Sequence, residues 1–177
     1  MITKSIKSRI QEYFLLNPTT RIRVRQLERE LKAPLPSVIR YTKELEKENI
    51  LKSTKIANIT VYAADRNSKI YLLEKKLFNI KTLHLSGLLD HITTEYNNPP
   101  IILFGSYARG EDIETSDIDI YIETPSKKET NTKKYEKILK RKIQLFTYEN
   151  IHKIENKELA NNILNGIIIN NFIEVFK

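Results

Sequence analysis

The stretch IILFGSYARGEDIETSDIDIYIE, residues 101–123, decides the fold of the C-terminal half. It opens with four apolar residues, Ile101–Phe104, which is the pattern of a short buried strand. Gly105 and Ser106 follow at once, and the segment Ser116–Ile122 then alternates polar and apolar residues, as a half-buried strand does. We therefore predict a strand, a Gly-Ser turn, a short loop and a second strand.

The alternation of the second strand carries a chemical consequence. Asp117 and Asp119 stand two residues apart, so both side chains point to one face, with backbones roughly 6.6 Å apart. Carboxylates placed in this way can converge on one Mg²⁺ or Mn²⁺, which prefer oxygen ligands. Gly105 allows close backbone approach, and a helix that starts there exposes N–H groups to an anion. A phosphate-binding turn beside a carboxylate pair indicates metal-assisted phosphoryl or nucleotidyl transfer.

These motifs resemble the nucleotidyltransferase superfamily that includes DNA polymerase β and the small, stand-alone minimal nucleotidyltransferases. The chain shows Gly-Ser, ten residues and Asp-x-Asp, and also the extended form Phe-Gly-Ser-x-Ala-Arg-Gly followed by Ser-Asp-Ile-Asp. The resemblance covers residues 82–177 and implies a mixed sheet with flanking helices. It implies that a nucleoside triphosphate and Mg²⁺ (or Mn²⁺) bind here, with Asp117 and Asp119 as catalytic metal ligands. The residues expected to bind the nucleotide are Gly105, Ser106, Arg109 and Ser116; Arg109 either neutralises the triphosphate or fixes the loop through an acidic neighbour.

One position departs from the family pattern. Downstream we predict a helix over 130–139, a third strand over 142–146, a helix over 156–165 and a last apolar segment over 167–176. Minimal members usually carry a third carboxylate on the third strand, in a context like Arg-Lys-Val-Asp-Leu, whereas this chain reads Arg-Lys-Ile-Gln-Leu over 141–145. Gln144 is therefore a poor Mg²⁺ ligand and no general base.

Two functions remain open on this evidence. The first is transfer of a nucleoside monophosphate, AMP foremost, to a protein, RNA or small-molecule acceptor. The second is a non-enzymatic DNA-binding regulator or an antitoxin, with a degenerate nucleotide-binding domain and a cognate toxin as partner.

The N-terminal half contains the segment RVRQLERELKAPLPSVIRYTKELEKENIL, residues 23–51. Apolar residues at helical spacing, together with Pro and Asn stops, predict three short helices. Two strands, Leu51–Ile56 and Ile59–Ala63, follow. Residues 1–65 resemble a winged helix-turn-helix domain, which implies a recognition helix and a wing that contact DNA or RNA. The residues expected to face nucleic acid are Ser37, Arg40, Tyr41, Lys43 and Lys47 on the helix, and Lys52 and Lys55 on the wing.

The charge distribution favours the same partner. The chain has 30 Lys/Arg and 22 Asp/Glu. Residues 1–97 contain 18 Lys/Arg against 10 Asp/Glu, whereas residues 98–177 contain 12 of each. The whole positive excess thus lies in the N-terminal half, where it indicates a polyanionic partner or, alternatively, charged helix surfaces that only contact solvent.

The remaining features restrict the class of protein. Residues 66–81 are expected to form a helical connector, because Ile70, Leu73, Leu77 and Ile80 recur at helical spacing. Leu83, Leu88 and Ile92 continue the pattern, and we expect this helical region to pack on both halves of the chain. The absence of cysteine excludes disulfide scaffolds and thiolate zinc sites. No stretch reaches the roughly 20 apolar residues of a membrane span, and the N-terminus lacks a signal-peptide core. We expect an α+β protein of the cytoplasm, with no membrane partner and with a homodimer as a possible assembly.

Overall fold

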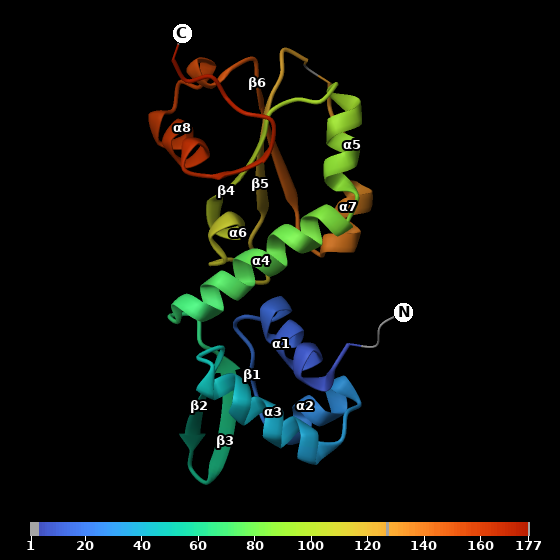
Figure 1. The fold of residues 1–177 in the computed structure, drawn as a ribbon, viewed down its shortest axis with the longest axis vertical. Helices are drawn as coiled ribbons and strands as arrows, with labels where there is room; N and C mark the ends of the chain where they lie inside the picture. Colours follow the sequence, from blue (N-terminus) through green and yellow to red (C-terminus); the bar gives the residue numbers. More distant parts are fainter. Residues whose placement is uncertain (1–3, 127, 177) are drawn as a thin grey trace. The chain divides into compact units, whose positions relative to one another are not determined.

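The computed structural model describes residues 4–126 and 128–176, and the chain divides into two compact units (Figure 1). Residues up to Lys75 belong to the first unit and residues from Lys76 onward belong to the second. Helix α4 (Lys69–Leu85) contributes residues to both units.

The first unit contains three helices and a small antiparallel sheet. The helices are α1 (Ile6–Leu16), α2 (Val24–Leu31) and α3 (Leu35–Lys47), and the strands are β1 (Arg21–Ile22), β2 (Leu51–Ile56) and β3 (Ile59–Ala64). The strand order is β1-β3-β2. Strand β1 was not predicted, because two residues are too few to show an alternating pattern. Ile10, Phe14, Leu27, Val38 and Leu45 are fully buried and form the core on which the helices pack.

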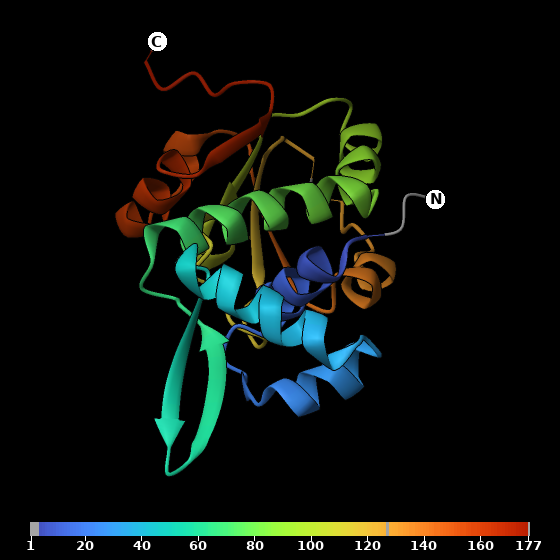
Figure 2. The same cartoon turned by 60° about the horizontal axis from the view of Figure 1, so that its bottom comes forward.

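Local hydrogen bonds explain where these elements begin and end. The Ser5 hydroxyl accepts from the Ser8 N–H at 3.1 Å and caps α1. Helix α3 begins at Leu35, and Pro36 occupies its first turn, where no N–H is needed. The hairpin of β2 and β3 turns at Ala57, with φ of 53°, and its strands extend away from the helices of this unit (Figure 2).

The helix predicted for the connector extends beyond residue 81. Helix α4 ends at Leu85, and a separate helix α5 (Leu88–Glu95) begins after Gly87, whose φ is +77°. Within the apolar repeat, Ile70, Leu73 and Leu77 are about half exposed. The later members pack into the core of the second unit: Leu83, Leu88 and Ile92 are buried, and Ile80 packs against them. Tyr71 is also buried, and its hydroxyl donates to the Phe14 carbonyl.

The second unit is built on a four-stranded mixed sheet with the order β6-β5-β4-β7. The strands are β4 (Ile101–Phe104), β5 (Ile118–Glu123), β6 (Ile143–Tyr148) and β7 (Ile167–Asn170). Strand β4 pairs antiparallel with β5 and β7, and β5 pairs parallel with β6. The apolar segment predicted over 167–176 is a strand only as far as Asn170.

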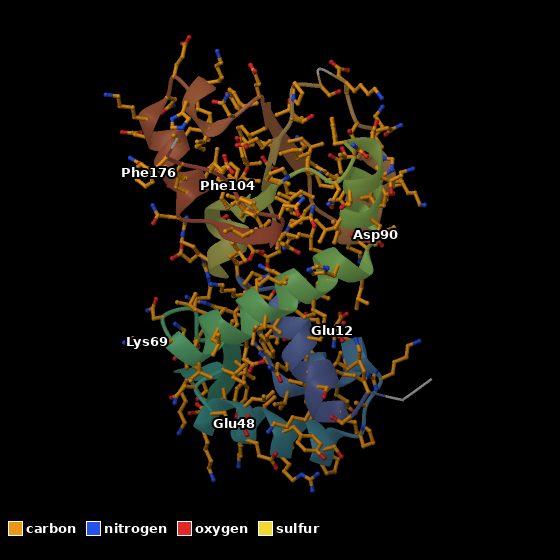
Figure 3. All side chains as sticks on the ribbon, turned by 45° about the horizontal axis from the view of Figure 1, so that its top comes forward. Glu12, Glu48, Lys69, Asp90, Phe104 and Phe176 are labelled. Atoms are coloured by element: carbon orange, nitrogen blue, oxygen red, sulfur yellow. The ribbon has the colours of Figure 1, made fainter. Side chains whose placement is uncertain are left out.

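Helices cover both faces of this sheet (Figure 1). One core joins β4 and β5 to α4, α5 and α7 (Lys133–Leu139), through residues such as Leu83, Ile92 and Leu139. The other core packs Ile102, Phe104 and Tyr121 against Ile163 of α8 (Lys157–Leu164) and against the short helix η1 (Ile151–Lys153). Phe104, labelled in Figure 3, ends β4 and leads directly into α6 (Gly105–Arg109). No helix of the described residues is long and apolar enough to cross a membrane.

Candidate active site

Strand pairing in the second unit brings the sequence motifs together at one end of β5. Asp117 directly precedes β5, and Asp119 is its second residue. Asp119 stands opposite Phe104 of β4 on one side and opposite Gln144 of β6 on the other. The Gly-Ser turn, the Asp pair and Gln144 therefore lie at the same end of these strands.

The Asp119 carboxylate lies against the start of α6. A Cβ built on Gly105 would stand 2.3 Å from Asp119 Oδ2, and the φ of Gly105 is +72°. Both the space and the backbone conformation therefore require glycine at position 105. The close approach fixes the carboxylate beside the N–H groups that open α6.

The surroundings of Asp119 disfavour its ionised form. Burial raises the pKa of Asp119, and the negative charge of Asp117 raises it further, while Arg109 lowers it in part. Desolvation and a like charge both disfavour the ionised form of Asp119. A divalent cation bound between the two groups would offset this repulsion and favour their ionised forms.

Gln144 contacts the other carboxylate. Its side-chain N–H (Nε2) donates to Asp117 Oδ2 at 2.7 Å. The two aspartates therefore face different neighbours: Asp119 faces the Gly105 backbone and Asp117 faces the amide of Gln144. The structure thus places Gln144 where the family pattern has its third carboxylate. Among the described residues, no cluster of three or more His, Cys, Asp or Glu side chains forms a metal site.

The other residues expected to bind nucleotide occupy the loop between α6 and β5. Arg109 is exposed at the end of α6 and forms a salt bridge with Glu111, with Nε to Oε2 at 2.7 Å. This salt bridge corresponds to the second role considered for Arg109, in which it fixes the loop through an acidic neighbour. The Ser116 hydroxyl accepts from the Ile113 N–H at 3.0 Å, so it closes the loop just before Asp117.

A buried polar cluster behind the loop was not predicted. Asp112 is 1% exposed and accepts from Asn79 Nδ2 at 2.6 Å, while Arg141 NH2 lies 3.7 Å from its other oxygen. Asn79 also donates to the Tyr107 carbonyl at 2.9 Å. Burial and the charge of Asp112 raise the pKa of Tyr107, so its hydroxyl stays neutral. Asp112 anchors the loop that carries the site, and its position among exposed acidic residues gave no sequence signal of burial.

Basic residues line an open pocket of about 910 Å³ beside Asp117. Helix α7 and the turn that leads into β6 contribute Lys133, Lys137, Lys140, Arg141 and Lys142, and the loop contributes Ser116 and Asp117. The sequence around these lysines does not indicate that they belong to the site, because only the pairing of β5 with β6 brings them next to the aspartates.

In the first unit, the residues expected to face nucleic acid lie on α3 and β2. Arg40, Lys43 and Lys47 are exposed along one side of α3, and Ser37 and Tyr41 are half-buried. The Arg40 guanidinium stacks on the Tyr41 ring at 4.4 Å and lies 3.7 Å from Glu44. On the wing, Lys52 contacts Asp65 at 3.6 Å, and Lys55 is exposed.

The glutamates of α3 have structural partners of their own. Lys7 of α1 contacts both Glu44 and Glu48, and Glu46 accepts from the Ser53 N–H at 3.1 Å. These contacts bind α3 to α1 and to β2. The acidic residues among the lysines of α3 therefore help to hold the unit together.

A second basic pocket, of about 620 Å³, lies between α2 and the hairpin turn. Arg23, Arg25 and Arg29 line one side, and residues 58–60 line the other. The arginines were counted in the charge balance of the sequence, but their assembly opposite the hairpin depends on the packing of the unit.

Comparison with known proteins identifies the second unit. Residues 85–170 match the model of the family described as "Nucleotidyltransferase domain". This part of the chain is a nucleotidyltransferase domain of the polymerase β-like type, as the Gly-Ser and Asp-x-Asp motifs predicted. A 65-residue segment is 43% identical to a protein of Methanocaldococcus jannaschii named "Putative protein adenylyltransferase". The match covers 33% of this chain and 65% of that protein, so it spans slightly less than two thirds of this curated relative. No solved structure matches the chain significantly.

Proposed function

We propose that the chain is a Mg²⁺-dependent nucleotidyltransferase that moves a nucleoside monophosphate, AMP foremost, from a triphosphate to an acceptor hydroxyl. The observation that carries the proposal is the convergence of Asp117 and Asp119 beside Gly105, where a side chain at position 105 would collide with Asp119. The nucleotidyltransferase match and the name of the relative from Methanocaldococcus jannaschii, a protein adenylyltransferase, support the same chemistry.

The donor set suits a hard divalent cation. Asp117 and Asp119 supply carboxylate oxygens, which are the ligands that Mg²⁺ prefers alongside phosphates and water. Burial and the charge of Asp117 raise the pKa of Asp119, and a divalent cation at the pair would offset the charge repulsion. Nucleotidyltransferase domains typically use a triphosphate and a divalent metal, which, when bound, would neutralise the triphosphate and polarise the reacting α-phosphate.

The residues of this chain would position the reactants. Gly105 and Ser106 would hold the triphosphate at the start of α6, and the aspartates would orient it. The acceptor oxygen then bonds to the α-phosphorus, the bond from that phosphorus to the bridging oxygen breaks, and pyrophosphate leaves. Since Gln144 offers an amide rather than a carboxylate, the proton of the acceptor hydroxyl passes to solvent. We expect tight triphosphate binding and slow transfer.

The test of this proposal is nucleotide binding measured by titration calorimetry with ATP and Mg²⁺. Asp119→Asn should weaken binding by at least about tenfold, because a carboxylate ligand contributes more than one factor of ten in affinity. The control is Asp90→Asn on the exposed first turn of α5, labelled in Figure 3, which should bind ATP as the unmodified chain does.

An unchanged ATP affinity in Asp119→Asn would remove the aspartates from the site. Incubation of the unmodified chain with labelled triphosphates, Mg²⁺ and cell lysate then identifies the acceptor. If ATP binds but no acceptor is labelled, the competing reading applies: a DNA-binding regulator or antitoxin whose second domain senses a nucleotide.

The first unit is proposed to be a winged helix that binds double-stranded nucleic acid. The observations that favour this are the exposed Arg40, Lys43 and Lys47 on one side of α3 and the arginine pocket beside the hairpin. Duplex affinity measured in gel shifts should fall steeply with salt, because phosphate neutralisation releases counterions.

The double change Arg40→Ala, Lys43→Ala should lower the slope of log affinity against log salt by about 1.8, at roughly 0.9 per phosphate contact. The matched control is Lys153→Gln, Lys157→Gln, two exposed lysines of the second unit. A salt-independent shift, or none, would instead favour a winged helix that binds protein.

A further inference from the structure

The lysine-rich pocket beside Asp117 lies on the side of β5 away from the Gly-Ser turn. Its lining includes Ser116 and Asp117 but neither Asp119 nor Gly105. In the strand order β6-β5-β4, α6 follows β4, whereas α7 and the turn into β6 form the pocket on the opposite side. If the triphosphate occupies the Gly105 side, as the proposed function has it, then this pocket is where an acceptor reaches the reacting centre.

The pocket concentrates positive charge in a domain that is otherwise balanced. Residues 128–142 contain seven Lys/Arg and two Asp/Glu, although residues 98–177 contain 12 of each. Lys133 and Lys137 stand four residues apart on one side of α7, and Lys140 follows the helix as its C-cap, in the left-handed region.

These lysines are available to a ligand, whereas their charged neighbours are occupied. Glu136 accepts from the Ile143 N–H at 3.1 Å and so fixes the turn into β6, and Arg141 faces the buried Asp112. Lys133, Lys137, Lys140 and Lys142 are exposed, and within the part of the chain that the structure describes no salt bridge involves them.

The lining also indicates which polyanion is recognised. It consists of Lys, Arg, Glu, Asp, Ser and Thr, and it contains no aromatic or aliphatic side chain. Protein partners are usually held by buried apolar or aromatic anchors, which this pocket lacks. A nucleic acid strand can be held through its phosphates alone, and it carries ribose hydroxyls next to those phosphates. The volume, about 910 Å³, is that of a large ligand site rather than of a single anion.

We propose that this pocket binds the phosphates of a single-stranded nucleic acid, RNA by preference, and presents its terminal hydroxyl to the reacting centre as the acceptor. The proposal rests on the nucleotidyltransferase function for the identity of the acceptor. The binding of the strand depends only on the lysines and requires neither metal nor triphosphate.

The test measures fluorescence anisotropy of a labelled single-stranded RNA of about 12 nucleotides, a length typical of such sites. All proteins carry Arg40→Ala and Lys43→Ala, which weakens the nucleic-acid binding proposed for the first unit equally in every protein compared, and EDTA is present. The pocket variant is Lys137→Gln, Lys140→Asn. Asn suits position 140 because Lys140 is in the left-handed region, with φ of 53°. The control is Lys153→Gln, Lys157→Gln, which removes equal charge outside the pocket.

In the pocket variant, RNA affinity should fall about tenfold, and the slope of log affinity against log salt should fall by about 1.4, at roughly 0.7 per phosphate contact of a single strand. The control should retain the affinity and slope of the parent protein. The affinity for ATP with Mg²⁺ should be the same in all three proteins.

Three results would overturn the proposal. If ATP affinity falls in the pocket variant as much as RNA affinity does, the lysines hold the triphosphate rather than an acceptor. If RNA affinity is unchanged but affinity for a polyglutamate peptide falls, the pocket receives an acidic protein segment. If the pocket variant and the control lose RNA affinity equally, the attraction is general charge. A parent protein that binds RNA but no ATP would refute the proposed nucleotidyl transfer while leaving the RNA site in place.

Discussion

The two sides of strand β5 differ, although each presents an aspartate of the same motif. On the β4 side, Asp119 is pressed against the Gly105 backbone, and its pKa is raised by burial and by its neighbour's charge. On the β6 side, Asp117 accepts a hydrogen bond from Gln144 and borders a pocket lined with lysines. Asp119 thus contacts a tight backbone turn, whereas Asp117, two positions away, borders an open basic surface.

This difference suggests that the two sides of β5 bind different reactants. On the β4 side, the Asp119 carboxylate packs closely against the Gly105 backbone, which suits a ligand whose phosphates are held in one geometry. The β6 side offers exposed, flexible ammonium groups, which suit a chain recognised by charge. Gln144 lies on the β6 side, where it donates a hydrogen bond to Asp117.

The largest expected effect is on the β4 side, where Asp119 contacts the Gly105 backbone. Gly105→Ala should lower the free energy of unfolding by about 1–3 kcal/mol in urea denaturation, because it adds left-handed strain and a collision with Asp119. It should also abolish ATP binding, since the carboxylate must move. Gly87→Ala is the matched control, with φ of +77° but its nearest neighbour at 4.0 Å. That variant should lose only the strain, roughly 1–2 kcal/mol, and keep ATP binding. Equal behaviour of the two variants would show that the contact with Asp119 is unimportant.

A smaller effect is expected on the β6 side, where Gln144 contacts Asp117. Gln144→Asp should cost about 1 kcal/mol of stability without metal, because it replaces a hydrogen bond to Asp117 by repulsion. Mg²⁺ should then raise the melting temperature more than it does in the unmodified chain, and transfer of nucleotide should become faster. Gln144→Ala is the control, because it removes the bond without adding charge. If Mg²⁺ stabilises Gln144→Asp and Gln144→Ala equally, position 144 lies outside the metal site.

The smallest effect is a pH dependence of stability. Because the pKa of Asp119 is raised in the folded state, its ionisation at neutral pH costs stability that the unfolded chain does not lose. Without metal, Asp119→Asn should therefore melt higher at neutral pH, by on the order of 1 °C. This gain should be absent below about pH 4, the ordinary pKa of Asp, and should grow as pH rises through the raised pKa. Asp90→Asn, on an exposed turn, should show no such gain. A pH-independent gain in Asp119→Asn would mean that its charge is not the cause.

The sequence by itself determined the local elements of this protein. Apolar spacing with Asn-Pro and Gly punctuation predicted the helices of both halves, and strand alternation placed Asp117 and Asp119 on one face, because these signals act between residues a few positions apart. The Gly-Ser and Asp-x-Asp spacing predicted a nucleotidyltransferase domain, which the family match over residues 85–170 confirms. The resemblance of residues 1–65 to a winged helix stays a prediction.

The tertiary structure alone decided which residues meet. The apolar repeat of α4 is buried at Leu83 but about half exposed at Ile70 and Leu77, because periodicity cannot say what covers a helix. Asn79 of the same helix is buried, and it donates to the Tyr107 carbonyl. Asp112 and Arg141 approach each other only when the sheet forms. The parallel pairing of β5 with β6 brings Gln144 to Asp117 and the lysines of α7 to the edge of the site. Strand register and the packing of α7 are properties of the whole folded domain, and no pattern within one segment carries them.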